Sequence, residues 1–255
     1  MNLTNKKIIV TGASSGIGKE LLFLLAAYQG VRIIAVARGV EQIDTFWGKV
    51  IPFACDVSSP EGIDALFTFA QQTFGNTDLF IANAGFAYIE KLDEADWKHI
   101  EDIFSLNTFS PIYTLQKLIQ EGNSEKNFVC TVSAAAIVSL PAYALYCSSK
   151  SALRHFINTY RYEKPANLHI TTVYPVATRT GFFDKATGKK ATPLPFPAQN
   201  VQIVAKAIIK GIEKNKKQVF PSFIFRVAYP LGRAFPFLFT IYSLLEKRKM
   251  SRWLK

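Results

Sequence analysis

The stretch "KKIIVTGASSGIGKELLFLLAAYQGVRIIAVAR", residues 6–38, decides the fold class of this chain. It begins with a β-branched apolar run, passes through a glycine-rich turn into an apolar pattern of helical length, and ends in a second β-branched run. Two buried strands joined by a helix are typical of a parallel sheet, because parallel strands need a crossover connection. We therefore expect a strand–helix–strand unit at the start of the chain.

The same alternation continues along the chain. Further apolar runs, each followed or preceded by a helical pattern, lie at 50–57, 78–85, 127–134, 168–175 and 217–220. This pattern predicts an α/β protein with a doubly wound, Rossmann-type parallel sheet that is covered by helices on both faces. Ligands of such sheets bind beyond the carboxyl ends of the strands. The one long stretch that reads as loop, residues 180–200, is a candidate lid.

Composition favours a globular intracellular protein. The 255 residues are 49% hydrophobic, which suits one large domain, and the start MNLTNKKIIV lacks the apolar region of a secretory signal. Three cysteines, Cys55, Cys130 and Cys147, are odd in number and lack metal-ligand spacing. They indicate reduced thiols in a cytosolic setting, with a catalytic thiol at Cys147 as the less favoured alternative. We expect no metal site and no nucleic-acid partner.

The net charge of +11 comes from the C-terminal part of the chain. Residues 203–255 contain 12 basic and 2 acidic residues, whereas residues 1–202 contain 18 and 17. We therefore divide the chain into a Rossmann-type domain, 1–218, and a hydrophobic basic extension, 219–255.

Three interpretations of this extension are open. A membrane span is the least favoured, because Arg226, Arg233 and three prolines interrupt its apolar residues. It can instead pack on the domain and close the substrate pocket, or it can bind a membrane surface through its aromatic and basic residues. We favour the membrane surface as the hypothesis for this segment.

The first strand ends in "TGASSGIG", residues 11–18, which places Gly12, Gly16 and Gly18 at a strand-to-helix turn. Glycines at this turn let the backbone approach a pyrophosphate, and the helix N-terminus supplies N–H donors and a positive dipole end. The alternative is that the glycines serve only tight packing between strand and helix.

A second cluster of polar residues follows later strands. Tyr146 and Lys150 are four residues apart on a predicted helix, so both side chains face the same way. Ser133 ends the preceding strand, at the edge of the sheet where ligands bind. In isolation, a Tyr and a Lys at this spacing are usually a surface pair on a helix. Tyr143 has no lysine four residues later, and we expect it to line the pocket or to pack.

Together these motifs resemble those of the short-chain dehydrogenase/reductase family. They read TGASSGIG at 11–18, Asn-Ala-Gly at 83–85, Asn107 in SLNTF, Ser133 in TVSAAA, and Tyr146 in YCSSK with Lys150. The resemblance implies an NAD(P)-dependent oxidoreductase that interconverts a carbonyl and an alcohol, with residues 1–218 as its dinucleotide-binding and catalytic domain. It also implies a homodimer or homotetramer that pairs through the helices bearing Asn107 and Tyr146.

The chemistry of such a reaction explains why these residue types are needed. Hydride transfer to a carbonyl leaves an alkoxide, which needs a proton donor and a hydrogen bond on its oxygen. We expect Tyr146 to donate the proton, and a neighbouring Lys150 ammonium to lower the phenol's pKa from about 10. The resemblance implies that Lys150 also holds the nicotinamide ribose, that Ser133 orients the substrate carbonyl, and that Asn107 fixes a water behind the lysine.

The residue after the second strand decides the expected cofactor. NAD sites place a carboxylate there, whereas this chain has Ala37 and Arg38 and no acid before Glu41. A guanidinium matches a 2′-phosphate, so we expect NADP(H), with a merely solvated Arg38 as the alternative. The expected cofactor-binding residues are Gly12, Ser14, Ser15, Gly16, Ile17, Gly18, Arg38, Asp56, Val57, Asn83, Ala84, Gly85, Tyr146, Lys150, Pro175 and Thr180.

Some of these assignments have alternatives or depart from the family. Asp56 resembles the residue on the adenine side, but it can also form a turn or cap the helix at Pro60. The family usually has Pro-Gly after its sixth strand, whereas here Pro175 is followed by Val176, whose Cβ restricts the backbone next to the nicotinamide. Thr180 lies where the family often has a threonine that bonds the carboxamide.

We therefore expect an NADPH-dependent oxidoreductase that acts on a hydrophobic, lipid-like substrate. The alternatives are a soluble 3-oxoacyl or small-carbonyl reductase, and a non-catalytic NADP-binding sensor or scaffold. The expected location is the cytoplasm, either free or at the membrane surface.

Overall fold

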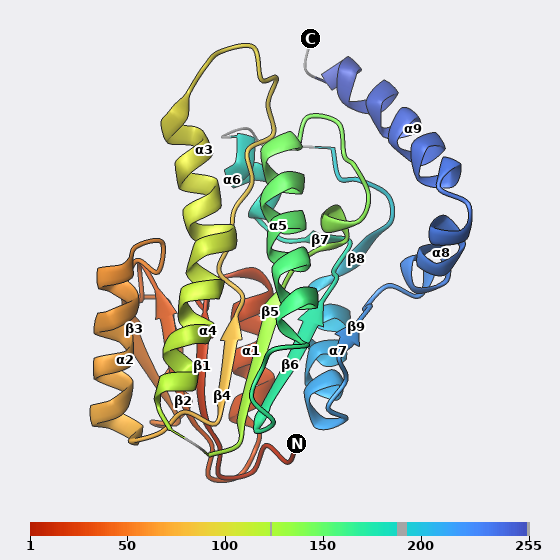
Figure 1. Cartoon of the computed structure of the whole chain (residues 1–255). Coiled ribbons are helices and arrows are strands. Elements are labelled where there is room, and N and C mark those ends of the chain that lie inside the picture. The colour runs from red at the N-terminus through yellow and green to blue at the C-terminus, as the bar shows by residue number, and fades with distance from the viewer. Residues whose placement is uncertain (123, 188–192, 254–255) are drawn as a thin grey trace.

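A seven-stranded parallel sheet forms the centre of the molecule (Figure 1). The computed structural model describes residues 1–122, 124–187 and 193–253. The strand order is β3-β2-β1-β4-β5-β6-β9, which is the order of a doubly wound sheet. The strands are β1 (Lys7–Thr11), β2 (Arg32–Ala37), β3 (Val50–Ala54), β4 (Leu79–Ala82), β5 (Lys126–Thr131), β6 (Leu168–Val173) and β9 (Gln218–Val219). The expected fold class is confirmed.

Helices cover both faces of the sheet because successive side chains of each buried strand point to opposite faces. In β1, Ile8 and Val10 pack in one apolar cluster and Ile9 in the other. The first cluster includes side chains of α1 (Gly16–Ala26) and α7 (Val201–Glu213). The second includes side chains of α2 (Pro60–Phe74), α4 (Ser110–Gln120) and α5 (Ala144–Tyr160).

The helical segment that bears Asn107 is interrupted by one wide turn. It consists of α3 (Trp97–Phe104), a π-helical turn η1 (Ser105–Phe109) and α4. π-helical turns inside α-helices are rare and occur frequently at functional sites. This turn contains Asn107, whose side chain is fully buried.

The segment 180–200 is not the continuous loop that its composition predicts. It begins with a short helix, α6 (Phe182–Thr187), and ends with β8 (Ala198–Asn200), which pairs in parallel with β7 (Ala177–Arg179). Residues 188–192, in the middle of the expected lid, lie outside the described residues. Because β8 pairs with β7, the strand that follows β6 in the chain, the end of this segment has a fixed position next to the sheet.

The C-terminal extension forms two helices, α8 (Phe223–Ala234) and α9 (Phe237–Trp253), at one side of the sheet (Figure 1). Tyr242 Oη donates a hydrogen bond of 2.6 Å to Phe196 O, and Ser243 Oγ donates one of 2.7 Å to Ser139 O. Phe225 and Met250 are buried. Within the described residues, no helix combines the length and the apolar character needed to cross a membrane. The extension therefore packs on the rest of the chain.

Candidate active site

One cavity of about 950 Å³ lies at the carboxyl ends of the central strands. Its lining includes the glycine-rich turn after β1 on one side, and the side chains of α6, α8 and α9 on the other. We call these the cofactor half and the cover half of the cavity. Ser133, Tyr146 and Lys150 all line it, so the structure brings together the catalytic side chains expected from the sequence, except for Asn107.

The glycine turn is packed so closely that larger residues do not fit. Gly12 has φ of +66°, and a Cβ on it would lie 2.9 Å from Ala84 Cα. A Cβ on Gly18 would lie only 2.1 Å from Gly12 O, a backbone atom that cannot move aside. In the described chain no side chain caps α1 at Ser15, so the first N–H groups of this helix are available to an anion. The turn therefore serves tight packing and also has the properties of an anion site.

Asn83 ties the ends of three strands together beneath the cavity. Its Nδ2 donates to Thr11 O at 3.2 Å, and its Oδ1 accepts from Thr131 Oγ1 at 3.2 Å. Ala84 N donates to Thr11 Oγ1 at 3.0 Å. These bonds link β1, β4 and β5, so the Asn83 side chain acts as a framework residue of the cofactor half.

Gly85 leaves room for the groups behind the reaction centre. A Cβ at this position would lie 2.9 Å from Asn107 Oδ1 and 3.3 Å from Lys150 Nζ. Only glycine therefore allows Asn107 and Lys150 to approach the same point from two different helices.

Arg38 and Asp56 lie at the far end of the cofactor half, after β2 and β3, and both line the cavity together with Val57. Asp56 Oδ1 accepts hydrogen bonds from Ser58 N at 2.9 Å and Ser58 Oγ at 2.8 Å. Burial raises the pKa of Asp56, but these bonds and the Arg38 charge outweigh it, and the net pKa is lowered. The cap of α2 is Ser59, so Asp56 forms a turn and is not the helix cap.

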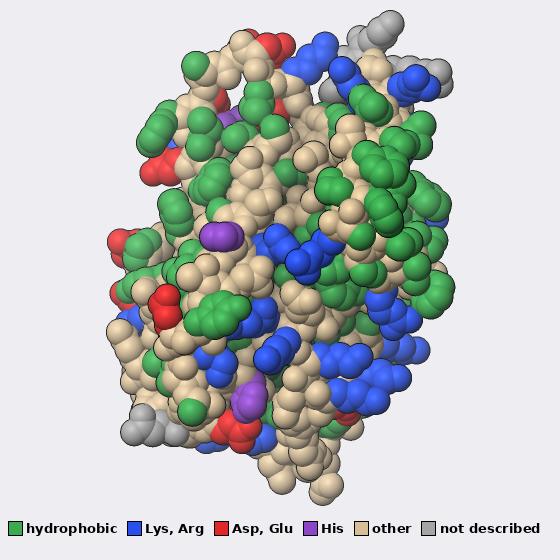
Figure 2. Space-filling model, turned by 45° about the vertical axis from the view of Figure 1, so that its right-hand side comes forward, with side chains coloured by type: hydrophobic (Ala, Val, Ile, Leu, Met, Phe, Trp, Pro, Cys, Tyr) green, Lys and Arg blue, Asp and Glu red, His purple; other side chains and the backbone are tan. Residues whose placement is uncertain are grey.

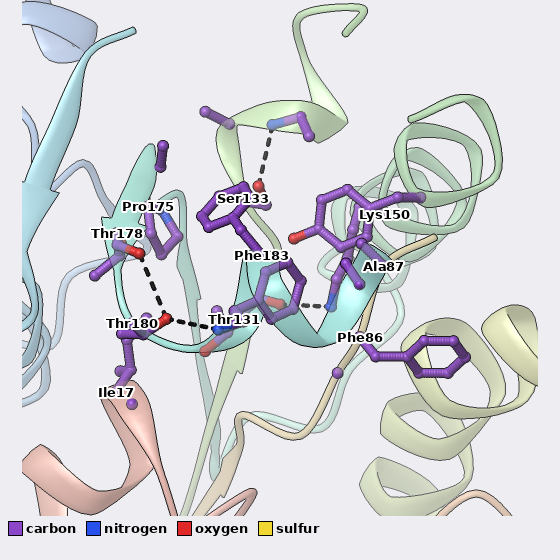
Figure 3. Close-up of a pocket in the computed structure, with 18 of the residues that line it drawn as sticks. Ile17, Phe86, Ala87, Thr131, Ser133, Lys150, Pro175, Thr178, Thr180 and Phe183 are labelled. Atoms are coloured by element: carbon purple, nitrogen blue, oxygen red, sulfur yellow. Dashed lines mark hydrogen bonds between the residues drawn. The ribbon is translucent and has the colours of Figure 1, made fainter. Parts of the chain in front are cut away.

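Ser133 has an unusual backbone conformation directly after β5. Its φ is +95°, which is rare for a residue other than glycine and costs about 1–3 kcal/mol. Its Oγ accepts a hydrogen bond of 3.2 Å from Ala135 N, as Figure 3 shows. Ala134 N donates to Pro175 O at 2.8 Å, which fixes this turn against the loop after β6. Such strain is typical of a residue held in place for function.

Lys150 is buried, and its Nζ donates a hydrogen bond of 3.0 Å to Thr131 O (Figure 3). Burial lowers its pKa to about 8. Burial also raises the pKa of Tyr146 to about 12, and hydrogen bonding with the Ser133 side chain opposes this shift. The expected lowering of the Tyr146 pKa below about 10 is therefore not found, because desolvation of the phenol outweighs the other effects.

Asn107 contacts the backbone behind Lys150 and is not part of the cavity lining. Its Nδ2 donates to Phe86 O at 2.8 Å and to Ser149 Oγ at 3.1 Å, and its Oδ1 accepts from Phe86 N at 3.1 Å. The residue thus holds the loop after β4 against α5. The water relay through Asn107 stays a prediction.

The loop after β6 accommodates Val176 without strain. Among the described residues, those with positive φ do not include Val176, and its side chain packs against an apolar cluster. Thr180 Oγ1 accepts from Phe182 N at 3.3 Å, at the start of α6. Its Cγ2 lies 3.3 Å from where a Cβ on Gly16 would be. Figure 3 places Thr180 beside Ile17, next to the N-terminus of α1.

Sequence reasoning missed the residues of the cover half. Phe182 of α6 lies against Tyr146 and Phe183 against Tyr143, with ring centroids 5.8 and 6.5 Å apart. Helices α8 and α9 add lining residues: Ile224, Phe225, Ala228, Leu231, Leu238, Phe239 and Tyr242. The only signal for them was the aromatic composition of the extension, which does not reveal which side chains turn inward.

Tyr143 both packs and lines the cavity, so its two expected roles are combined. Its side chain is buried, and its hydroxyl has no hydrogen-bond partner within the described residues. Burial raises the pKa of this phenol far above its usual range.

Known proteins are similar to this chain in sequence or in fold. A 3-ketodihydrosphingosine reductase from Dictyostelium discoideum is 27% identical over 288 residues, covering 95% of this chain and 83% of the relative. A short-chain dehydrogenase from Burkholderia cenocepacia in complex with NADP has a TM-score of 0.81 at 20% identity, covering 96% of this chain and 99% of that chain. One from Burkholderia phymatum in complex with NAD has a TM-score of 0.80 at 19% identity, covering 93% and 96%.

At such identities the two solved structures establish the fold alone. The sequence model described as short chain dehydrogenase matches residues 6–191, which is well over half of the chain. With a glycine turn, a serine and a Tyr-x-x-x-Lys pair at one cavity, this chain belongs to the short-chain dehydrogenase family of oxidoreductases.

Proposed function

We propose that this chain is an NADPH-dependent oxidoreductase that interconverts a carbonyl and a secondary alcohol on an apolar, lipid-like compound. The observation that carries the proposal is the position of Ser133, Tyr146 and Lys150 in one cavity that joins the glycine turn to an apolar cover.

The cofactor half has the features that a dinucleotide phosphate needs. The uncapped N-terminus of α1 and the bare backbone at Gly12 suit a pyrophosphate, with Ser14 and Ser15 beside it. The exposed Arg38 lines the cavity after β2, where a guanidinium suits a 2′-phosphate. When bound there, NADPH would supply the hydride.

The side chains of this chain supply the proton and the electrostatics. Because its pKa is about 12, Tyr146 is protonated at neutral pH and can donate to the carbonyl oxygen during reduction. Lys150, with a pKa of about 8, is mostly cationic at neutral pH and stabilises the negative charge that the donation leaves on the phenol. The Ser133 hydroxyl offers the second hydrogen bond to the substrate oxygen.

The cover half supports an apolar substrate. Aromatic and aliphatic side chains of α6, α8 and α9 surround this part of the cavity: Phe183, Phe225, Leu231, Leu238 and Phe239. Apolar walls with a few polar groups at one end suit a long or bulky hydrocarbon bearing one reactive oxygen. The name of the Dictyostelium relative, 3-ketodihydrosphingosine reductase, supports a lipid ketone as the substrate class.

The test is the loss of NADPH absorbance with a panel of carbonyl compounds and the purified full chain. We expect faster oxidation with long-chain and polycyclic ketones than with small water-soluble ones, and faster with NADPH than with NADH. NADPH binding without carbonyl-dependent oxidation would instead support a non-catalytic sensor or scaffold. A preference for small carbonyls would support the soluble-reductase alternative, and a preference for NADH would overturn the cofactor assignment.

A further inference from the structure

The outer surface of α8 and α9 carries a large apolar patch, which we call the apolar face. Its large hydrophobic side chains are Phe223, Ile224, Val227, Leu231, Phe235, Phe237, Leu238, Ile241, Leu244 and Leu245, all between 39% and 69% exposed. Nineteen such side chains are exposed in the described residues, and the ten on these two helices and on Phe235 between them are more than half. Figure 2 shows hydrophobic side chains gathered on this side of the molecule. Apolar surface concentrated in this way marks contact with another apolar phase.

The apolar face is continuous with the cavity. Ile224, Leu231 and Leu238 are 51%, 49% and 39% exposed, and the same three side chains line the cavity that contains Tyr146. They come from both helices, so side chains of α8 and α9 together form the wall between the cavity and this surface. A ligand lying on the apolar face is thus one layer of side chains away from the cover half.

Basic residues accompany the apolar face. Residues 219–253 contain six basic residues and a single acidic one, Glu246. Glu246 is buried, and its carboxylate accepts hydrogen bonds from Phe196 N at 3.1 Å and Lys249 Nζ at 2.9 Å. The exposed charges of the two helices are therefore all positive within the described residues, and Figure 2 shows Lys and Arg side chains bordering the apolar patch.

Helix α8 has the one-sided apolar pattern of an interfacial helix, whereas α9 separates its apolar and basic residues along its length. In α8, Phe223, Val227 and Leu231 follow one another at intervals of four residues, which places them on one side. In α9, the exposed apolar residues lie between 237 and 245, and the basic residues follow from 247 onward. The apolar part can enter the acyl boundary of a bilayer while the cations remain among the headgroups.

We propose that the apolar face binds an anionic membrane surface and that the cavity takes its substrate from the lipid phase. This inference rests on the proposed function for the class of substrate. A lipid surface fits better than a second copy of this chain, because two copies meeting here would bring their positive charges together. A second copy would also cover the exposed side of Ile224, Leu231 and Leu238, through which the cavity communicates with the surface.

The binding test is sedimentation of the full chain with phosphatidylglycerol-containing vesicles and with pure phosphatidylcholine vesicles. The test variant is Ile241→Asp with Leu244→Asp, two exposed residues of the apolar face outside the cavity lining. The matched control is Ile203→Asp with Leu92→Asp, because these side chains are 52% and 56% exposed but lie outside α8 and α9. We expect the test variant to bind anionic vesicles about 100-fold more weakly, and the control to bind like the unmodified chain.

Two results would overturn the binding proposal. One is equal recovery of the unmodified chain in the supernatant with and without anionic vesicles at low salt. The other is equally weak binding of the test and control variants, which would assign the effect to added charge. Sedimentation velocity without lipid tests whether a second copy binds the apolar face. If the unmodified chain forms a dimer that the test variant does not form, and neither protein binds vesicles, the apolar face serves self-association.

Kinetics separate this inference from the proposed function. For a long-chain methyl ketone dissolved in anionic vesicles, we expect the test variant to lose at least about tenfold in kcat/KM, while its activity on cyclohexanone stays unchanged. Equal activity of both proteins on the vesicle-borne ketone would overturn substrate uptake from the lipid phase. The unmodified chain failing on both ketones would overturn the proposed function instead.

Discussion

The two halves of the cavity are formed by different kinds of groups. In the cofactor half, backbone atoms and short side chains at the strand ends make the contacts, as in the bonds from Asn83 and Ala84 to Thr11. In the cover half, long side chains of α6, α8 and α9 make them, and many of these remain partly exposed. Main-chain contacts leave little freedom of adjustment, whereas side chains can change rotamer. We infer that one half is made to hold an invariant cofactor and the other to accommodate variable apolar groups.

Two glycines show the same difference on a smaller scale. A Cβ on Gly18 or on Gly232 would lie 2.1 Å from its nearest neighbour. For Gly18 this neighbour is the carbonyl oxygen of Gly12, which the sheet holds in place, whereas for Gly232 it is the tip of the Phe239 ring. The same overlap is therefore rigid in the cofactor half and adjustable in the cover half.

The largest effect is expected at the border between the halves. Tyr146→Phe removes the proton donor but keeps the ring, so we expect turnover to fall about 100- to 10,000-fold. NADPH affinity should stay within a few-fold, because the ring still fills its place in the cavity. Steady-state kinetics measure the turnover, and fluorescence titration measures the NADPH affinity. Substantial remaining activity of this variant would show that Tyr146 is not the proton donor.

A pair of alanine substitutions tests whether one half is rigid and the other adjustable. Gly18→Ala should lower the free energy of unfolding by about 1–3 kcal/mol or more and abolish tight NADPH binding, because α1 must move away from the turn. Gly232→Ala should change the stability little, since the gain in helix propensity, about 0.5–1 kcal/mol, offsets the displacement of the Phe239 ring. Urea unfolding of both variants checks this, and equal losses would contradict the comparison.

Arg38→Asp tests how the far end of the cofactor half selects its ligand. The substitution removes a phosphate partner and adds an acceptor for a ribose hydroxyl, so the ratio of NADP to NAD affinity should fall by roughly 10- to 150-fold. Titrations with both cofactors give this ratio, and Arg32→Asp, at the opposite end of β2 from Arg38, is the control. An unchanged ratio would indicate that the preference for NADP over NAD depends on Ser14, Ser15 or Lys19 instead.

The pH dependence of cofactor binding tests the buried lysine. The pKa of Lys150 is lowered to about 8, so its cationic form, which suits an anionic ligand, is lost as the pH rises through that value. We expect NADPH to bind about tenfold more weakly at about pH 9 than at about pH 7. Lys150→Met should bind weakly at both values. A dissociation constant of the unmodified chain that is independent of pH in this range would show that the lysine keeps its charge.

The smallest effect is expected at Tyr143, which contacts Phe183 of the cover half. Its buried hydroxyl has no hydrogen-bond partner in the described structure, so Tyr143→Phe should leave the stability equal or raise it by about 1 kcal/mol. Turnover should also stay within a few-fold, in contrast to Tyr146→Phe. Thermal unfolding and steady-state kinetics check both points. A clear rise in KM would instead identify the hydroxyl as a substrate contact.

The sequence by itself determined the parallel sheet and most of the candidate catalytic set. Strand and helix periods are local properties, and the carboxyl ends of parallel strands necessarily meet at one edge. Ser133, just after β5, and the pair Tyr146 and Lys150, one turn apart on α5, were therefore predictable as neighbours from their spacing together with the resemblance to the family.

Only the tertiary structure decided the environment of these residues. The pKa of Tyr146 is raised because elements far apart in the sequence, α6 among them, bury the phenol, and no local pattern measures that desolvation. The lining of the cover half has the same origin. Which side chains of α8 and α9 face the cavity depends on how the two helices pack on the loop at Phe196 and on Ser139. The sequence shows which residues the two helices contain, but packing decides which of these side chains point into the cavity.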